Sequence, residues 1–372
     1  MKKIILAPDS FKGTMSASEV SGILKNIASK HFKNFEIIEM PVADGGEGTV
    51  DAFVRILNGE VRTITVSGPL GAPVEAKIGL IGDSAIIELA QASGITLIDK
   101  LDPYKASTFG TGEMILFTIN QGIKKIYVGL GGSATNDGGT GLLRALGVVF
   151  RSSDGRELIA TDEILLNLDY IDVSGINPKI REVEIECFCD VDVPLLGEKG
   201  ATSIFGPQKG VLDKAFFENG LRRFAGLISK QFGIDTKNIY GAGAAGGTTT
   251  ALCAFLGATS TSGIEKLLDL GAFDTLLEDA YFVVSGEGRL DSQSVRGKVV
   301  SGIATRCKAK GIPLLVIAGS LSEDYEVVYE YGVTAVMSCV PSPMSFEDVR
   351  AKPAQLLEKA ADRAFRLIIF KE

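Results

Sequence analysis

Strands alternate with helices near both ends of the sequence, and this order restricts the possible fold more than any other feature. The apolar run 3–7 is followed by apolar residues at helical spacing between 20 and 27, and the run 35–40 also precedes an amphipathic segment. Near the other end, the runs 281–284 and 314–317 are each followed by a helical segment. Parallel strands need long crossover connections, which are usually helices. The alternation therefore predicts a parallel sheet that is covered by helices on both faces.

The middle of the sequence follows another pattern. The runs 61–66, 74–80 and 85–89 are short, alternate apolar with polar residues and are separated by glycine-containing turns, which is typical of an antiparallel meander. Residues 150–158 predict a β-hairpin that turns at Asp154-Gly155. The central region thus predicts a mixed α/β sheet.

Chain length agrees with this division. The sequence has 372 residues, more than the roughly 250–300 at which a single hydrophobic core stops growing. We therefore expect an α/β protein with a discontinuous, doubly wound Rossmann-like domain, formed by 1–59 and 279–372, in which a mixed α/β domain, 60–278, is inserted.

Composition and charge exclude several classes of function. The net charge is −8, and no stripe of Lys and Arg with interleaved aromatics is present, which argues against a nucleic-acid partner. No run approaches the ~20 apolar residues of a membrane span, and the four apolar residues before Pro8 are too few for a signal peptide. We expect a cytoplasmic protein whose five cysteines are reduced core residues. With one histidine, His31, proton transfer and metal binding fall to carboxylates and lysine.

A glycine-rich loop lies between a predicted strand and a predicted helix in residues 125–150. Glycine removes the Cβ atoms that keep an anion away from the backbone, and a helix start directs N–H groups towards it. After Gly131 and Gly132 the loop holds four hydrogen-bonding side chains in five positions, more than a turn requires: Ser133, Thr135, Asn136 and Asp137. It predicts a phosphate site, with a turn that needs glycine only for its dihedral angles as the alternative.

Further polar residues follow the predicted strands of the doubly wound domain. Ligands of such sheets bind beyond the carboxyl ends of the strands. The residues at these ends are Asp9, Ser10, Lys12, Asp44, Glu47, Glu287, Arg289, Asp291 and Ser320. Any one of the carboxylates has helix capping as an alternative role. Together with two cations, they favour a site for a small anion next to metal-binding carboxylates.

Known nucleotide motifs do not explain these loops. The segments 129–134 and 241–246 match a dinucleotide-binding pattern. The first lacks the acidic residue expected about 20 positions later, and the second follows a poor strand. A Walker A sequence is absent, since Val299 follows Gly297-Lys298.

The sequence resembles the bacterial class I glycerate kinases, of the glycerate 2-kinase type, over nearly its whole length. The motifs that carry the resemblance are APDSFKG (7–13), ADGGEGT (43–49), GLGGSATNDGG (129–139), CDV with PLLG (189–197), FGPQKG (205–210), GAGAAGG (241–247) and GEGRLDSQS (286–294). The resemblance implies ATP-dependent phosphorylation of D-glycerate with Mg²⁺, in a cleft between two α/β domains. It favours 2-phosphoglycerate as the product, with 3-phosphoglycerate possible. Two departures are Val193, where such kinases usually have Asn, and Thr248-Thr249-Thr250 in place of a Gly/Ala-rich continuation.

Phosphoryl transfer needs mainly positioning and neutralisation of charge. We expect Gly131, Gly132, Ser133 and Asn136 to hold the ATP phosphates. Ser10, Lys12 and Arg289 are expected to meet the glycerate carboxylate or the transferred phosphoryl group. Asp190 and Asp44 are expected to hold Mg²⁺ or to act as the base, with Asp291 and Glu47 as further candidates. Spacing alone does not divide these roles.

Two other classes of function fit parts of this inventory. An NAD-dependent hydroxyacid dehydrogenase would also use glycine loops and an arginine, and a non-catalytic protein that binds small organic acids would also use a two-domain cleft. The sequence sets no oligomeric state.

Overall fold

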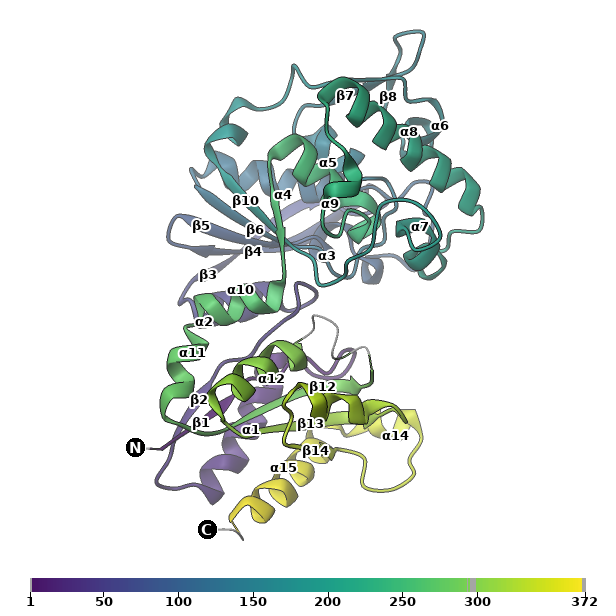
Figure 1. The fold of residues 1–372 in the computed structure, drawn as a ribbon. Helices are drawn as coiled ribbons and strands as arrows, with labels where there is room; N and C mark the ends of the chain where they lie inside the picture. The colour runs from purple at the N-terminus through teal and green to yellow at the C-terminus, as the bar shows by residue number, and fades with distance from the viewer. Residues whose placement is uncertain (1, 293, 295–298, 370–372) are drawn as a thin grey trace. The chain divides into compact units, whose positions relative to one another are not determined.

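The computed structural model describes residues 2–292, 294 and 299–369. Gln293 of the last motif lies outside these residues. The chain divides into two compact units (Figure 1): unit 1 contains Met1–Asp44, Asp51–Leu57 and Ile264–Glu372, and unit 2 contains Gly45–Val50 and Asn58–Gly263. Residues 264–278, which the sequence placed in the insertion, therefore lie in unit 1. Each unit is described by itself.

The strands described in unit 1 form a parallel five-stranded sheet in the order β14-β13-β12-β1-β2. Their bounds are β1 Lys3–Leu6, β2 Glu36–Glu39, β12 Ala280–Leu290, β13 Leu314–Leu321 and β14 Ala335–Ser338. In order of appearance within the unit, this is the doubly wound order 2-1-3-4-5, whose direction of winding reverses between β1 and β12. The predicted parallel α/β class is confirmed.

Helices cover this sheet. The helices described in unit 1 are α1 Ala17–His31, α2 Thr49–Ile56, α10 Gly263–Leu270, α11 Phe273–Leu276, α12 Val299–Lys310, α13 Val328–Tyr331, α14 Phe346–Ala351 and α15 Pro353–Ile369. The first residues of α2 and α10 belong to unit 2. Ser16 and Glu19 form a capping box at the start of α1. Alternate strand residues such as Ile4 and Leu6 share a core with α1 and α15. His31, at the end of α1, contacts Asp362 of α15 at 2.7 Å rather than ending in solvent.

Strands β12 and β13 are longer than the sequence indicated. The segments 285–291 and 318–320 were expected to be loops, but the two strands pair as far as Leu290 and Leu321. Glycines allow this pairing, since a Cβ on Gly319 would lie 2.4 Å from the Gly288 carbonyl oxygen. Residues 286–290 of the motif 286–294 are therefore part of β12.

The strands described in unit 2 form a six-stranded mixed sheet in the order β11-β10-β6-β5-β4-β3. Their bounds are β3 Glu60–Ser67, β4 Pro73–Ile81, β5 Ser84–Glu88, β6 Lys125–Gly129, β10 Glu184–Phe188 and β11 Thr259–Thr261. Strands β3, β4 and β5 are antiparallel neighbours, as the meander predicted, and β5, β6, β10 and β11 are parallel. The predicted hairpin is confirmed as β7 Val149–Arg151 and β8 Glu157–Leu158, which share a small sheet with β9 Tyr170–Asp172.

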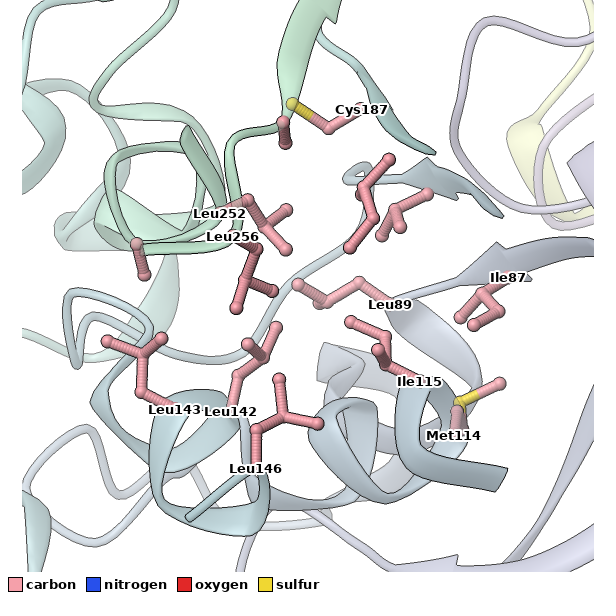
Figure 2. Packing of buried hydrophobic residues seen from close by; sticks show 14 of the residues in the cluster. Ile87, Leu89, Met114, Ile115, Leu142, Leu143, Leu146, Cys187, Leu252 and Leu256 are labelled. Carbon is pink, nitrogen blue, oxygen red and sulfur yellow. The ribbon is translucent and has the colours of Figure 1, made fainter. Parts of the chain in front are cut away.

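Helices pack on the larger sheet through one apolar core. The helices of unit 2 are α3 Ala90–Ser93, α4 Phe109–Asn120, α5 Thr140–Ala145, α6 Thr161–Asn167, α7 Ala201–Phe205, α8 Lys214–Phe232 and α9 Ala244–Leu256. Figure 2 shows Met114 and Ile115 of α4, Leu142 of α5 and Leu252 of α9 converging on residues of the sheet, all of them buried. This core fixes the loops that leave β5, β6 and β10.

Two further expectations concern the whole chain. All five cysteines are free thiols, as predicted. Among the helices of the described residues, none combines the length and the apolar character that a membrane crossing requires.

Candidate functional site

Unit 1 has a pocket of about 870 Å³ at the carboxyl ends of β1, β12, β13 and β14. Its charged lining residues are Asp9, Lys12, Asp44, Glu287, Arg289 and Asp291. Open α/β sheets bind their ligands at this end of the strands, where the direction of winding reverses. The pocket thus brings together Ser10 and four other predicted site residues of unit 1: Lys12, Asp44, Arg289 and Asp291.

Asp9 is the most buried carboxylate of the pocket, with 6% of its surface exposed. Its backbone N–H donates to the Gly286 carbonyl oxygen at 2.8 Å, which ties the end of β1 to β12. Burial, and then the negative charge of Asp44, raise the pKa of Asp9 to about 8, although Lys12 and the Ser10 N–H oppose the shift. Asp9 is therefore mainly protonated at neutral pH, so it can exchange a proton near the pH at which an enzyme works.

Lys12 and Asp44 form an ion pair at the mouth of the pocket, with 3.5 Å between Nζ and Oδ2. Asp44 raises the pKa of Lys12 above its ordinary value, so the ammonium stays charged. The lysine side chain is 64% exposed, which leaves it accessible to a ligand. An exposed pair of this kind contributes little to stability.

The extension of β12 positions the charged residues of the motif 286–294. Side chains alternate between the two faces of a strand, so Glu287 and Arg289 share one face, and both line the pocket together with Asp291. Ser10 lies opposite on the loop after β1, and its buried hydroxyl has no hydrogen-bond partner within the described residues. These side chains surround a space in which a polar ligand could be bound.

In unit 2 the glycine loop after β6 packs against the segment 45–46. The N–H of Gly131 donates to the Gly45 carbonyl oxygen at 3.0 Å, and a Cβ on Gly131 would lie 2.5 Å from Cα of Gly46. This packing requires glycine at 131 whether or not a phosphate binds. Gly132 is exposed and has φ of 73°, so the accessible part of the loop is its turn.

Lys209 lies under this turn and is 2% exposed. Its ammonium donates to Ser133 Oγ and to the Thr135 carbonyl oxygen, both at 2.6 Å. Burial lowers the pKa of Lys209 to about 7, with Asp137 opposing the shift. The lysine ties the motif at 205–210 to the glycine loop.

Asn136 and Asp137 are fully buried in the same loop. The Asn136 amide donates to Thr202 Oγ1 at 3.0 Å, while its Oδ1 has no partner within the described residues. The Asp137 carboxylate accepts from the N–H and hydroxyl of Thr108 and from the N–H groups of Gly139 and Gly141. These contacts hold the loop in shape, and Asn136 is one of the residues that maintain it.

The motif 241–247 packs on the other side of the loop. The Gly138 N–H donates to the Gly246 carbonyl oxygen at 2.9 Å, and a Cβ on Gly246 would lie 2.2 Å from the Thr135 carbonyl oxygen. The departures from the family pattern also have contacts here. The hydroxyls of Thr248 and Thr250 donate to carbonyl oxygens of the turn, and the Val193 carbonyl oxygen accepts the Gly243 N–H.

Asp190 and Glu47, two further predicted site residues, both belong to unit 2, whereas Asp44 belongs to unit 1. Asp190 Oδ1 accepts from the Ser262 hydroxyl at 2.9 Å and from the Gly263 N–H at 3.0 Å. Glu47 is exposed. In the part of the chain that the structure describes, no three His, Cys, Asp or Glu side chains are grouped as ligands of one metal ion.

Sequence reasoning assigned no individual role to Asp9 or Lys209. Both stand in motifs that the sequence singled out, at 7–13 and 205–210, yet nothing in the spacing shows that they are buried. The signal available in the sequence was a charged residue within a motif whose other residues are mostly small or apolar. Charged residues are rarely fully buried without a specific role, so such a position deserves notice.

Comparisons with known proteins identify the family of this chain. A family model described as "Glycerate kinase family" matches residues 4–369. The chain is 42% identical to the glycerate kinase of Halalkalibacterium halodurans over 367 residues, 97% of each chain. It is 43% identical to the glycerate 2-kinase of Escherichia coli over 346 residues, 91% of each. The crystal structure of a putative glycerate kinase 2 from Salmonella typhimurium LT2 superposes with a TM-score of 0.87 at 38% identity, covering 100% of this chain and 99% of that one. The resemblance read from the motifs is confirmed: the chain belongs to the glycerate kinase family, a family of kinase enzymes.

Proposed function

We propose that this protein transfers the γ-phosphoryl group of ATP to a hydroxyl group of D-glycerate, with 2-phosphoglycerate and ADP as products. The family supports the reaction class, and the pocket of unit 1 is the observation that carries the proposal. It combines two cations with several carboxylates at the end of a doubly wound sheet. Phosphoryl transfer needs this combination of charge neutralisation and a proton acceptor.

Lys12 and Arg289 are the proposed contacts for the transferred phosphoryl group. Both line the pocket, and Asp44 raises the pKa of Lys12 above its ordinary value. As the oxygen of the substrate hydroxyl bonds to phosphorus, its proton must pass to a nearby base. Asp44 is the proposed base, because its carboxylate lines the pocket 3.5 Å from the Lys12 ammonium, the proposed contact of the phosphoryl group. Ser10 and Asp291 are proposed to position the substrate.

Magnesium fits the chemistry of this pocket. Mg²⁺ binds through one or two carboxylates together with water and substrate phosphates. Glu287, which lines the pocket and whose charge acts on Asp9, would supply one of these carboxylates, and Asp44 is the alternative ligand if another carboxylate is the base. When bound, the ion would neutralise charge on the phosphate oxygens of ATP. Asp190 and Glu47 remain further proposed ligands of Mg²⁺, because both stand in motifs that carry the family resemblance.

The glycine loop of unit 2 is proposed to bind phosphate oxygens of ATP at its exposed turn. Gly132 is the exposed residue of this turn, and Lys209 below it donates a hydrogen bond to Ser133 Oγ, which holds that hydroxyl in place. Gly131 and Asn136 support the turn through their contacts with Gly45 and Thr202. Gly131 and Asn136 thus contribute to phosphate binding by maintaining the conformation of the loop.

A product assay tests the proposed reaction. The enzyme is incubated with D-glycerate, ATP and MgCl₂, ADP release is followed, and the product is identified by phosphorus NMR. We expect one ADP for each 2-phosphoglycerate. Turnover of a nicotinamide cofactor without ADP would instead support a dehydrogenase, and tight binding of D-glycerate without ADP release would support a binding protein.

Asp190→Asn and Asp44→Asn test the carboxylate assignments in the same assay. Asn keeps an acceptor oxygen for the Ser262 hydroxyl and the Gly263 N–H, so Asp190→Asn removes the charge with little change in the contacts. A near wild-type kcat in both variants would remove the assignment.

A further inference from the structure

The pocket of unit 1 has a charged half and an apolar half. The charged half lies at the ends of β1 and β12. The apolar half is formed by the segment 339–344 after β14 and by the helices that follow it, with Pro341, Pro343, Met344, Val349 and Leu356 on the wall. Nothing in the chemistry of D-glycerate, which carries an oxygen on every carbon, requires this second half.

Pocket size gives a second argument. The volume of about 870 Å³ is in the range of sites that enclose ligands of drug size. Glycerate has seven non-hydrogen atoms, whereas ATP has 31. The pocket therefore matches the larger substrate, and its apolar half is available to a flat, weakly polar group about as large as a purine.

The position of the pocket agrees with this match. It begins at the ends of β1 and β12, between which the winding of the sheet reverses, and extends across β13 to β14. Flavodoxin, whose sheet has this strand order, binds the mononucleotide FMN at that point. The side chains that follow β1 and β12 would then lie near the phosphates, and the segment after β14 near the base.

The apolar wall has a defined shape before a ligand binds. The Cys339 N–H donates to the Ala318 carbonyl oxygen at 2.8 Å, and the Val340 N–H donates to Ser338 Oγ at 3.1 Å. Pro341 and Pro343 fix the backbone angle φ. Met344 adds a polarizable side chain that adapts to a flat surface. A pre-formed wall lowers the entropic cost of binding.

We propose that Pro341, Pro343 and Met344 bind the base of the nucleoside triphosphate, with its phosphates directed towards Lys12 and Arg289. This inference rests on the proposed ATP-dependent activity and assigns the nucleotide, rather than D-glycerate, to the larger part of the unit 1 pocket. The charges agree with it. Several carboxylates stand beside the two cations, which suits a polyphosphate that carries a divalent cation better than a bare carboxylate.

Photolabelling of the full-length enzyme tests the location of the base directly. The enzyme is irradiated with 8-azido-ADP and MgCl₂, and the modified peptide is identified by mass spectrometry. We expect an adduct within residues 338–356 that excess ADP suppresses. A suppressible adduct only within 129–139 or 241–250, or none at all from an enzyme that turns over ATP, would overturn the assignment. An enzyme that releases no ADP with D-glycerate would instead overturn the proposed function.

Kinetics of Met344→Glu give an independent readout. A negative charge on the wall should raise the KM for ATP and the Kd for mant-ADP by about tenfold or more, because burying a charge beside a base is unfavourable. The KM for D-glycerate should change less than about threefold. Leu367→Glu is the matched control, since Leu367 of α15 is 69% exposed and does not line the pocket. Unchanged nucleotide affinity in a folded Met344→Glu enzyme, or an equal change in both KM values, would refute the proposal.

Discussion

The backbone N–H of Gly131 donates a hydrogen bond to the carbonyl oxygen of Gly45, with 3.0 Å between the two atoms. These residues stand in two motifs that are far apart in the sequence and meet in unit 2. The contact continues at Gly129, where a Cβ would lie 2.5 Å from the same Gly45 oxygen. The two glycine-rich motifs are therefore explained in part by the close approach of two backbones, in addition to any contact with a ligand.

Gly131→Ala should destabilise the protein by about 1–3 kcal/mol, the usual cost of overpacking a closely packed site. The new methyl group would meet the Gly46 backbone, which cannot move aside as a flexible side chain can. Thermal unfolding followed by circular dichroism measures the change. Gly226→Ala is the control, because Gly226 is exposed on α8 and a Cβ at this position would have no atom within 4 Å; it should be neutral or slightly stabilising. Equal melting temperatures for the two variants would contradict the packing argument.

Asp9→Asn should change how stability depends on pH. The folded-state pKa of Asp9 is raised to about 8, so between about pH 4 and 8 the folded protein holds a proton that the unfolded chain has lost. Stability contributed by this group is present at low pH and is lost as the pH rises through that window. The variant should therefore gain stability relative to the wild type at pH 8, by more than about 1 kcal/mol, and show no such gain at pH 4.

Urea unfolding at several pH values between 4 and 8 measures this difference. Asp51→Asn, which changes an exposed carboxylate on α2, should parallel the wild type throughout. If Asp9→Asn also runs parallel to the wild type, the Asp9 carboxyl is ionised in the folded protein and the argument from burial is wrong.

Much of the fold could be predicted from the sequence, because local pattern determined it. Alternation of strands and helices gave the doubly wound sheet, and short alternating runs gave the meander of β3, β4 and β5. The continuation of β12 to Leu290 could not be predicted, since Gly286 and Gly288 indicate a loop by composition. They stay in the strand because β13 approaches closely enough to exclude any Cβ at Gly286.

The candidate site was predictable to a smaller extent. The position of Lys12, Asp44, Arg289 and Asp291 in one pocket followed from the rule that ligands bind at the carboxyl ends of parallel strands. Burial did not follow, because it depends on tertiary neighbours. Nothing in the sequence around Lys209 indicates that it is buried, and only the structure shows its Nζ in contact with Ser133 Oγ.

Asp44→Asn should lower kcat by at least about 100-fold, the usual contribution of a group that transfers a proton in catalysis. Stability should fall by less than about 1 kcal/mol, because the lost ion pair with Lys12 is exposed. Asp102→Asn is the control, since it breaks a comparable pair with Lys105, 3.7 Å long, on unit 2. Steady-state kinetics with D-glycerate and ATP measure the effect. A kcat that falls equally in the two variants would show that loss of a surface ion pair alone lowers kcat, and would contradict the role of Asp44 as the base.

Lys209→Met should remove a rise in stability between about pH 7 and 10. Burial lowers the folded-state pKa of Lys209 to about 7, whereas the unfolded chain keeps the ordinary value near 10.5. Within this window the unfolded chain binds a proton that the folded chain has released, so the free energy of unfolding increases with pH. The methionine variant lacks the titrating group and leaves the Thr135 carbonyl oxygen without its donor, which adds a constant loss of about 1–3 kcal/mol.

The two effects separate in a series of urea titrations from pH 7 to pH 10. The free energy of unfolding of the wild type should rise with pH relative to that of Lys209→Met. The control is Lys214→Met, which changes an exposed lysine at the start of α8 and should follow the wild type. The KM for ATP should also rise in Lys209→Met, because Ser133 loses the ammonium that positions it under the exposed turn. A constant gap at every pH would show that Lys209 is charged in the folded protein at pH 10, and would restrict its role to packing.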